Sequence, residues 1–265
     1  MIKLIATDID GTLLNAEGKL PDGFGELILK LESKGVYLAI ASGRQYHTLL
    51  NDFKEFKDKL IFIAENGAIV IYQGRELFFR PLEKEKVEGI IKDIRATKEC
   101  DIVLCGKNSA YVETLNSEFE AEVRKYYHRC ELVKDLLSVE DDILKVALYD
   151  YIDPQKNSYP SLHAKWGKEV NVIVSGKHWM DFGNPEVDKG VALKKIQDML
   201  GVKYEETMVF GDYFNDVPMM EVSYYSYAVK NAPEGVRAKA RFEAPSNQEE
   251  GVMKIICQME KDGLI

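Results

Sequence analysis

The order of apolar and polar positions along the first 80 residues predicts strands that alternate with helices. Short apolar runs are typical of buried strands, and apolar residues three or four positions apart are typical of helices that cover a sheet. The predicted strands are 3–7, 36–41 and 60–64, and the predicted helices are 23–34 and 45–57. Such alternation predicts right-handed βαβ units and therefore a parallel sheet.

The pattern changes after a predicted hairpin, in which strands 68–72 and 76–80 flank a turn at 73–75. Beyond Pro81, strands and helices follow one another without βαβ alternation. The strands predicted there are 102–104, 111–113, 144–149 and 170–174, with a helix that includes Leu162 and Trp166. We interpret this stretch as an α+β insertion of roughly a hundred residues, enough for a small core of its own.

From Asp188 onward the first pattern returns. The helices predicted there are 191–200, 215–222 and about 248–261, and the strands are 208–210 and 225–229. The chain is therefore predicted to have an α/β fold with a discontinuous core, residues 1–80 and 185–265. The inserted domain is predicted to be residues 81–184, with hinges near both of its ends.

The composition limits what the protein does. Hydrophobic residues make up 46% of the 265 positions, so the chain is apolar and long enough to bury a sizeable core. The net charge of −9 gives no general attraction to nucleic acid or to an anionic membrane. No apolar stretch approaches the ~18 residues that cross a bilayer.

The protein is expected to be cytoplasmic. The first apolar run stops at Asp8, too early for a secretory signal. The four cysteines form no CxxC pair, so we interpret them as reduced thiols, with one structural disulfide as the alternative.

Two aspartates directly follow the first predicted strand, in the run DIDGT. Because ligands of parallel α/β sheets bind beyond the carboxyl ends of the strands, Asp8 and Asp10 fall where a site is expected. Gly11 allows a sharp turn that exposes backbone amides. The alternative is a solvated turn that happens to carry two acids.

Two further segments place residues that could bind an anion at the starts of predicted helices. Ser42 and Gly43 follow the second predicted strand, and a hydroxyl with free amides at a helix N-terminus can bind phosphate, although Ser42 could equally be an ordinary N-cap. Lys189 opens the helix after Asp188, where the helix dipole disfavours a cation unless an anion lies close by. The alternative for Lys189 is a surface side chain.

The run GDYFND follows another predicted strand. Asp212 and Asp216 are four residues apart, so a helix that begins here brings them together, and with Asp8 they form an acidic cluster. Such a cluster is costly unless a cation compensates it, and an all-oxygen set suits Mg²⁺. The alternative is a helix whose first-turn acids are stabilised by its own dipole.

Taken in order, DIDGTLL, SGR, DKG and GDYFND resemble the four motifs of the haloacid dehalogenase superfamily of phosphotransferases. The insertion falls between the second and third motifs, and the run ENGA at 65–68 precedes the hairpin that leads into it. These details and the closing stretch 232–251 resemble the corresponding features of the Cof-type subgroup. That subgroup belongs to subfamily IIB and carries a cap of the second class between the second and third motifs. The resemblance covers about 1–80 and 185–265 and implies a Rossmann-like core with an inserted α+β cap.

The resemblance also implies roles for individual residues. Asp8 would attack phosphorus and form an aspartyl-phosphate, and Asp10 would protonate the leaving alcohol and then activate water. Mg²⁺ would be held by Asp8, the backbone carbonyl of Asp10, Asp212 and, with a weaker claim, Asp216, while the phosphoryl oxygens would be bound by Gly11, Ser42, Gly43, Lys189 and Asn215. Arg44 would either reach the substrate or pair with acids of the core.

The function implied by the resemblance is hydrolysis of small phosphorylated metabolites, sugar phosphates above all, by a Mg²⁺-dependent phosphatase. A phosphohexomutase of the same superfamily is the runner-up, and a non-catalytic sensor of a phosphorylated ligand is a third hypothesis, against which the presence of Asp10 argues. The cap is expected to close over the site and to exclude phosphoproteins and nucleic acid polymers. The expected partner is thus a small phosphorylated metabolite, without nucleic acid or membrane, for a monomer or small homo-oligomer.

Overall fold

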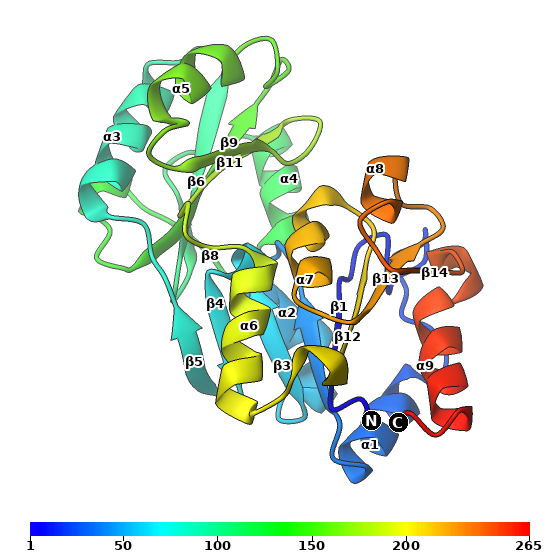
Figure 1. The fold of residues 1–265 in the computed structure, drawn as a ribbon. Helices are drawn as coiled ribbons and strands as arrows, with labels where there is room; N and C mark the ends of the chain where they lie inside the picture. Colours follow the sequence, from blue (N-terminus) through cyan, green and yellow to red (C-terminus); the bar gives the residue numbers. More distant parts are fainter. The chain divides into compact units, whose positions relative to one another are not determined.

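The computed structural model describes residues 1–265, and the contacts between its Cα atoms divide the chain into two compact units. Unit 1 consists of Met1–Tyr46, Asp52–Phe79 and Asp188–Ile265, and unit 2 consists of His47–Asn51 and Arg80–Val187. Each unit contains a sheet with helices beside it (Figure 1).

The sheet of unit 1 has eight strands in the spatial order β14-β13-β12-β1-β2-β3-β4-β5. The strands are β1 (Leu4–Thr7), β2 (Tyr37–Ala41), β3 (Leu60–Ala64), β4 (Ile69–Tyr72), β5 (Arg75–Phe79), β12 (Thr207–Gly211), β13 (Tyr225–Val229) and β14 (Phe242–Ala244). All neighbours from β14 to β3 are parallel, whereas β4 and β5 form the antiparallel hairpin predicted above. Every residue of β1, β3 and β12 is buried, as expected for strands covered on both faces.

Helices flank this sheet and complete the parallel α/β architecture, so the predicted fold class is confirmed. They are α1 (Phe24–Ser33), α6 (Lys189–Leu200), α7 (Val217–Glu221), α8 (Glu234–Arg237) and α9 (Gly251–Lys261). Helix α2 (Tyr46–Asp52) begins and ends in unit 1, but its residues His47–Asn51 belong to unit 2. Helices α6 and α7 contact each other, and an ion pair of 2.6 Å between Lys30 and Glu260 joins α1 to α9. Central strand β1 lies between β2 and β12, so the segment that follows it is held from both sides.

Two of the predicted helices are shorter than their apolar patterns suggested. The helix predicted at 45–57 ends at Asp52, because Phe53 leaves the helical conformation and packs its ring against Phe24 and Phe62. The helix predicted at 215–222 is a 3₁₀ turn (Phe214–Asp216) followed by α7, because Pro218 fits only the first turn of a helix. In both places the local packing or the proline overrides the helical spacing.

Unit 2 has a six-stranded sheet in the order β10-β11-β9-β6-β7-β8. Its strands are β6 (Cys100–Gly106), β7 (Ala110–Val112), β8 (Cys130–Leu132), β9 (Ile143–Asp150), β10 (Asn171–Val174) and β11 (Trp179–Gly183), and its helices are α3 (Lys84–Arg95), α4 (Ser117–Tyr126) and α5 (Tyr159–Trp166). Alternate residues of β9 serve two cores: Val146 and Leu148 pack with α3 and α5, and Ala147 and Tyr149 pack with α4.

The sequence analysis missed α4 and β8, although Asn116 is a recognisable N-cap whose side chain accepts a hydrogen bond from the Phe119 amide. All four cysteines are free. None of the helices is both long enough and apolar enough to span a membrane.

Candidate active site

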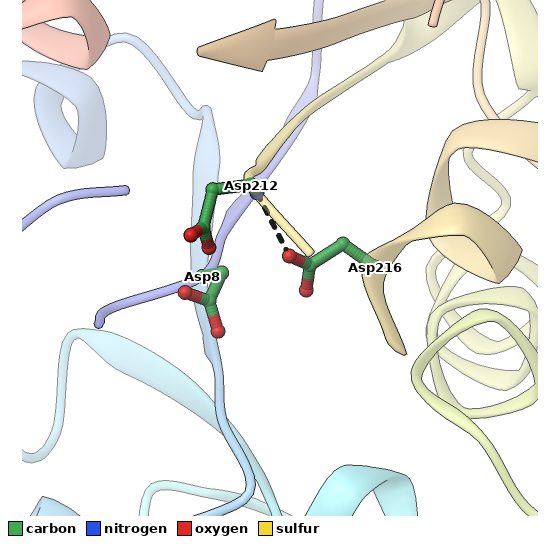
Figure 2. A group of neighbouring side chains, drawn as sticks. All are labelled: Asp8, Asp212 and Asp216. Carbon is green, nitrogen blue, oxygen red and sulfur yellow. Dashed lines mark hydrogen bonds between the residues drawn. The ribbon is translucent and has the colours of Figure 1, made fainter. Parts of the chain in front are cut away.

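Three carboxylates meet at the carboxyl ends of two neighbouring strands of unit 1. Asp8 follows β1 and its amide still donates to the Phe210 carbonyl of β12, so the two strand ends are in register. Asp212 follows β12, and Asp216 ends the 3₁₀ turn after it. One oxygen from each carboxylate lies within 4.8 Å of the other two. Figure 2 shows these three side chains. The predicted acidic cluster is therefore present in the structure.

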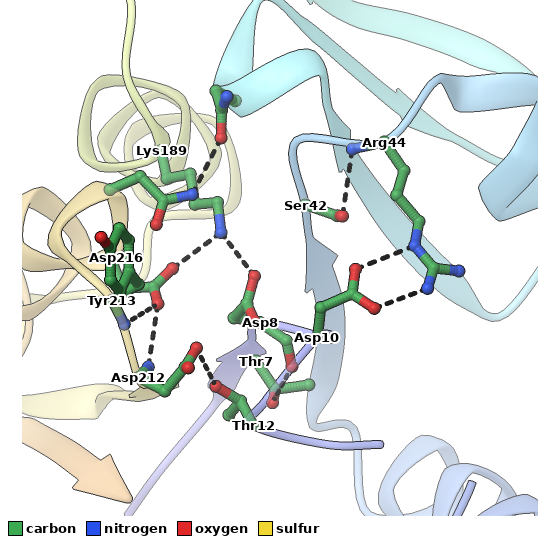
Figure 3. Close-up of polar contacts among 12 residues, drawn as sticks. Thr7, Asp8, Asp10, Thr12, Ser42, Arg44, Lys189, Asp212, Tyr213 and Asp216 are labelled. Carbon is green, nitrogen blue, oxygen red and sulfur yellow. Dashed lines mark hydrogen bonds and ion pairs between the residues drawn. The ribbon is translucent and has the colours of Figure 1, made fainter. Parts of the chain in front are cut away.

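Lys189, the first residue of α6, carries its ammonium into this cluster (Figure 3). Its Nζ donates to Asp8 Oδ1 at 2.6 Å and to Asp216 Oδ1 at 2.7 Å, and the side chain is fully buried. The alternative of a surface lysine is therefore wrong. The carboxylate of Asp188 caps α6 by accepting from the Val191 amide, which sets the direction in which the helix leaves the site.

Asp216 joins the two ends of its own loop. Its Oδ2 accepts from the amides of Asp212 and Tyr213, at 2.9 and 3.0 Å, while its Oδ1 accepts from Lys189. Both oxygens of this fully buried carboxylate thus have protein partners. The geometry suits a carboxylate that fixes the loop and orients Asp212.

Gly11 lies directly against Asp212. Its φ of +82° is in the left-handed region, and a Cβ at this position would come within 2.4 Å of Asp212 Oδ2. The next residue, Thr12, donates from Oγ1 to Asp212 Oδ1 at 3.1 Å. A side chain at position 11 would therefore displace a carboxylate of the cluster as well as strain the backbone.

The segment Glu65–Gly67 links the predicted phosphate-binding positions to one another. All three residues have positive φ values, an arrangement rare outside glycine, and the Asn66 amide donates to the Ser42 carbonyl at 3.0 Å. The Asn66 side chain accepts from Asn215 Nδ2 at 3.0 Å and would meet a Cβ at Gly43 at 3.2 Å. Asn215 itself is exposed, so the structure brings it beside Asn66 and not into the buried cluster.

Asp10 and Arg44 form a pair at the exposed edge of the site. The guanidinium donates to both Asp10 oxygens, at 2.9 Å from Nε and 2.6 Å from Nη2, and to Asp52 at 2.8 Å from Nη1. The Asp10 side chain is 60% exposed, and the cluster formed by Asp8, Asp212 and Asp216 does not include it. Of the two predicted roles for Arg44, the structure shows the pairing with acids of the core.

We expect Arg44→Ala to lower kcat by roughly 10- to 100-fold, because Asp10 loses both contacts that hold its carboxylate in one orientation. The free energy of unfolding should change by less than about 1 kcal/mol, since the pair is partly exposed. Steady-state kinetics and urea unfolding would check both. In Arg44→Lys the ammonium cannot donate in parallel to both Asp10 oxygens, so the kcat of this variant should lie between those of the wild type and Arg44→Ala. Arg237→Ala, which breaks an exposed pair with Glu243, is the matched control, and equal kcat values for all variants would contradict the prediction.

Two asparagines that the motifs did not single out for a role hold the loop after Asp8. Asn231 donates from Nδ2 to the Gly11 carbonyl at 2.8 Å, and it accepts from the Asn247 amide. Asn247, largely buried, donates from Nδ2 to the Leu14 carbonyl at 2.8 Å. No sequence pattern marks Asn231, whereas Asn247 lies in the closing stretch that already resembled the family.

The electrostatics of the cluster favour a bound cation. Three carboxylates and one ammonium leave two negative charges without a counter-charge inside a buried site. Burial raises the pKa of Asp8 from 3.8 to about 8, against the lowering effect of Lys189, and Asp216 raises it further. Burial and Asp216 also raise the pKa of Asp212, to about 6. For Lys189 burial alone would lower the pKa, but the charges of Asp216 and Asp8 outweigh it and raise the pKa.

These residues fit a metal ion. Oxygen ligands from Asp8 and Asp212 converge, and a divalent cation would restore charge balance and favour the ionised form of both carboxylates. The hydrogen bonds of Asp216 and Thr12 to the Asp212 segment would orient that ligand.

We expect the metal-free protein to lose stability as the pH rises from about 4 towards about 8. The folded state, in which the pKa of Asp8 is raised, binds a proton that the unfolded chain has already released in this range. With a chelator present, the melting temperature should fall by roughly 5 °C or more across this window relative to Asp8→Asn, in which the titrating group is absent. A rise of the wild-type melting temperature relative to that variant would contradict the prediction.

Comparison with known proteins agrees with the fold. A family model described as haloacid dehalogenase-like hydrolase matches residues 5–256. The chain is 33% identical to 5-amino-6-(5-phospho-D-ribitylamino)uracil phosphatase YbjI of Escherichia coli, over 98% of this chain and 97% of that protein. It is 28% identical to the phosphatase of the same name, YcsE, of Bacillus subtilis, over 96% and 94%. A solved structure from Streptococcus mutans superposes with a TM-score of 0.88 at 28% identity, covering 98% of this chain and 100% of the other.

The chain therefore belongs to the haloacid dehalogenase-like hydrolases. The resemblance in the four motifs, including the Cof-type subgroup, is confirmed, and so is the prediction of an enzyme of the phosphatase class. The roles of the individual site residues in the reaction remain predictions. The contacts described above say which atoms each of these roles would involve.

Proposed function

We propose that the protein is a Mg²⁺-dependent phosphomonoester hydrolase that works through an aspartyl-phosphate on Asp8. The main support is the buried Asp8 carboxylate at the end of the central strand, held at 2.6 Å by the Lys189 ammonium and facing Asp212 and Asp216. A nucleophile needs a fixed direction, and the paired lysine and the strand backbone supply it.

In this proposal Mg²⁺ would be held by Asp8, Asp212 and the backbone carbonyl of Asp10, while Asp216 fixes the loop that carries Asp212. When bound, the cation would offset the repulsion between a phosphate dianion and an attacking carboxylate. Lys189, Ser42 and the amides near Gly11 and Gly43 bind the phosphoryl oxygens, and Asn215 assists from the edge held by Asn66.

The first step transfers the phosphoryl group to the enzyme. An Asp8 oxygen attacks phosphorus, the bond between phosphorus and the ester oxygen breaks, and Asp10 gives its proton to the leaving alcohol. Arg44 donates to both Asp10 oxygens in the structure, so the oxygen that takes up the proton gives up its contact with Arg44, while the other oxygen keeps its contact and the carboxyl group stays oriented. Lys189 favours the ionised form of Asp8 and holds the Asp8 oxygen in one direction.

The second step returns the enzyme to its starting form. Asp10, now ionised, takes a proton from water as the water oxygen attacks phosphorus. The bond between phosphorus and the Asp8 oxygen breaks, which releases inorganic phosphate and leaves Asp8 ionised and Asp10 protonated. The same group thus serves as acid and then as base.

The substrate is proposed to be a small phosphorylated metabolite built on a sugar or sugar alcohol. The relatives are named for a compound with a 5-phospho-D-ribityl group, which is a phosphorylated sugar alcohol. Residues 81–184 are proposed to act as the cap that selects among such esters, while residues 1–80 and 185–265 carry the chemistry.

Phosphate release from a panel of sugar phosphates, D-ribitol 5-phosphate and a phosphopeptide would test this function. We expect turnover of the small esters that needs Mg²⁺ and stops with a chelator, no turnover of the phosphopeptide, and phosphate on the peptide containing Asp8 after acid quenching. No release from any ester by folded protein that binds Mg²⁺ would overturn the proposal. A requirement for a bisphosphorylated sugar as activator would point to the mutase instead.

A further inference from the structure

Strand β10 of unit 2 differs from the other edge strands of the molecule. The two sheets end in four edge strands, β5 and β14 in unit 1 and β8 and β10 in unit 2. Three of these edges carry charged residues, which commonly protect an edge from pairing with another chain: Arg75 and Glu76 in β5, Glu131 in β8 and Glu243 in β14. Strand β10, with the sequence NVIV, has neither a charged residue nor a proline. It is therefore the edge most open to an additional strand.

The outer side of β10 has backbone groups that the sheet does not use. The Ser175 amide donates to the Trp179 carbonyl at 3.0 Å, and the antiparallel pairing of β10 with β11 continues from there. Because bonded and non-bonded pairs alternate in such a pairing, Ile173 turns its amide and carbonyl to β11. Val172 and Val174 turn theirs to the free edge, where four backbone groups can therefore bond to another strand.

Apolar surface accompanies these groups. The Ile173 side chain, in the middle of the strand, is 53% exposed. A hollow of about 480 Å³ lies beside the strand, and its lining contains no charged side chain: Gln155, Tyr159, Val172, Ile173 and Val174. When a strand adds to a sheet edge, its main chain supplies hydrogen bonds and its side chains fill such hollows. The edge thus suits an uncharged strand and not a charged peptide.

We propose that β10 pairs antiparallel with β10 of a second copy of this chain, so that two unit 2 sheets join into one. A twofold axis requires a surface that is complementary to itself. In one register Val172 faces Val174 of the second copy, Val174 faces Val172, and Ile173 faces its own counterpart on the axis. Each pair of valines then exchanges two hydrogen bonds. The inference does not depend on the proposed phosphatase function.

The charges beyond the strand favour the same register. Counting on from both ends of β10 places the exposed Glu169 opposite the exposed Lys177 of the second copy, and the symmetry repeats this pair. Opposite charges that face each other across two strands attract, whereas like charges repel. A shift by two residues in either direction separates the pair. It also leaves one of the two outward residues, Val172 or Val174, opposite a residue outside β10.

Sedimentation velocity of the full chain over a range of concentrations would test the inference. We expect the wild type to shift from monomer to dimer as its concentration rises. Ile173→Lys should raise the dissociation constant by about tenfold or more, because two ammonium groups then face each other on the axis. Lysine suits the folded monomer, since Asp181 lies opposite position 173 in β11. Leu132→Lys, at an exposed position of the edge strand β8, is the matched control and should change the constant by less than about twofold.

Reversing the charges tests the register. Glu169→Lys and Lys177→Glu should each raise the dissociation constant by about three- to tenfold, because each creates two like-charge pairs in the dimer. The combined variant restores opposite charges and should return the constant to within about twofold of the wild type. Amide hydrogen exchange at Val172 and Val174 should also slow as the concentration of the wild type rises.

Several results would overturn the inference. One is a wild type that sediments only as a monomer at millimolar concentration. Another is a dimer whose dissociation constant is the same in Ile173→Lys as in the wild type, which would place the interface elsewhere. The third is a combined charge reversal that dimerises as weakly as the single reversals, since the proposed register requires the pair between Glu169 and Lys177.

Discussion

Asp8→Asn is expected to lower phosphate release from every ester by about 10⁴-fold or more. The amide keeps the shape of the side chain but is not a nucleophile, and loss of a covalent nucleophile leaves only the acceleration that binding and positioning provide. Removing one of three crowded carboxylates should not destabilise the fold, so the melting temperature should stay level or rise. Single-turnover measurements at high enzyme concentration would detect the residual rate.

The control for this variant is a replacement that changes charge outside the cluster. Asp198→Asn removes an exposed carboxylate that pairs with Lys194 in α6, and it should leave both rate and stability unchanged. Turnover by Asp8→Asn within tenfold of wild type would exclude Asp8 as the nucleophile. Phosphate trapped on another residue after acid quenching would lead to the same conclusion.

Lys189→Met is expected to damage stability and activity together. The ammonium is fully buried and contacts Asp8 and Asp216, so its removal leaves three carboxylates without a positive partner. Removing one partner of a buried ion pair typically costs about 3–5 kcal/mol of the free energy of unfolding. The rate should fall by about 10²- to 10³-fold because the developing phosphoryl charge loses a pre-organised donor.

Urea unfolding with a chelator and again with Mg²⁺ would separate the two effects. In the metal-free state the full loss of stability should appear, and Mg²⁺ should recover part of it by neutralising the same carboxylates. Lys194→Met, at an exposed lysine of the same helix, should change the free energy of unfolding by less than about 1 kcal/mol. An equally small effect of Lys189→Met would contradict the role given to its charge.

Part of the site could be predicted from the sequence because its residues directly follow strands that stand out as short apolar runs. The run LIFIA at 60–64 and the run YSYAV at 225–229 became β3 and β13 with the predicted bounds. Parallel strands expose their carboxyl ends at one edge, so Asp8 and Asp212 had to lie close together once β1 and β12 were neighbours. The position of Lys189 at a helix start predicted an anion beside it, but its complete burial is seen only in the structure.

The remaining contacts depend on pairs of residues for which a single sequence has no pattern. Nothing in the neighbourhood of Asn231 indicates that its side chain reaches the Gly11 carbonyl, and nothing near Asp52 indicates that it shares Arg44 with Asp10. The positive φ values of Glu65 and Asn66 are also unexpected from residue type. Such contacts are decided by tertiary packing, which periodicity does not describe.

The order of strands in the unit 1 sheet has a consequence for how the chain is made. Thr12 and Asp212 touch although they are 200 positions apart, because β1 pairs with β12. On the ribosome, β1 through β5 therefore emerge with one side of the apolar strand β1 unpaired, while the strands of unit 2, all contiguous in the chain, can complete their own sheet. The inserted unit can therefore fold before the sheet of unit 1 is complete. A nascent chain stopped before residue 207 exposes the unpaired edge of β1, an apolar strand edge of the kind that chaperones bind.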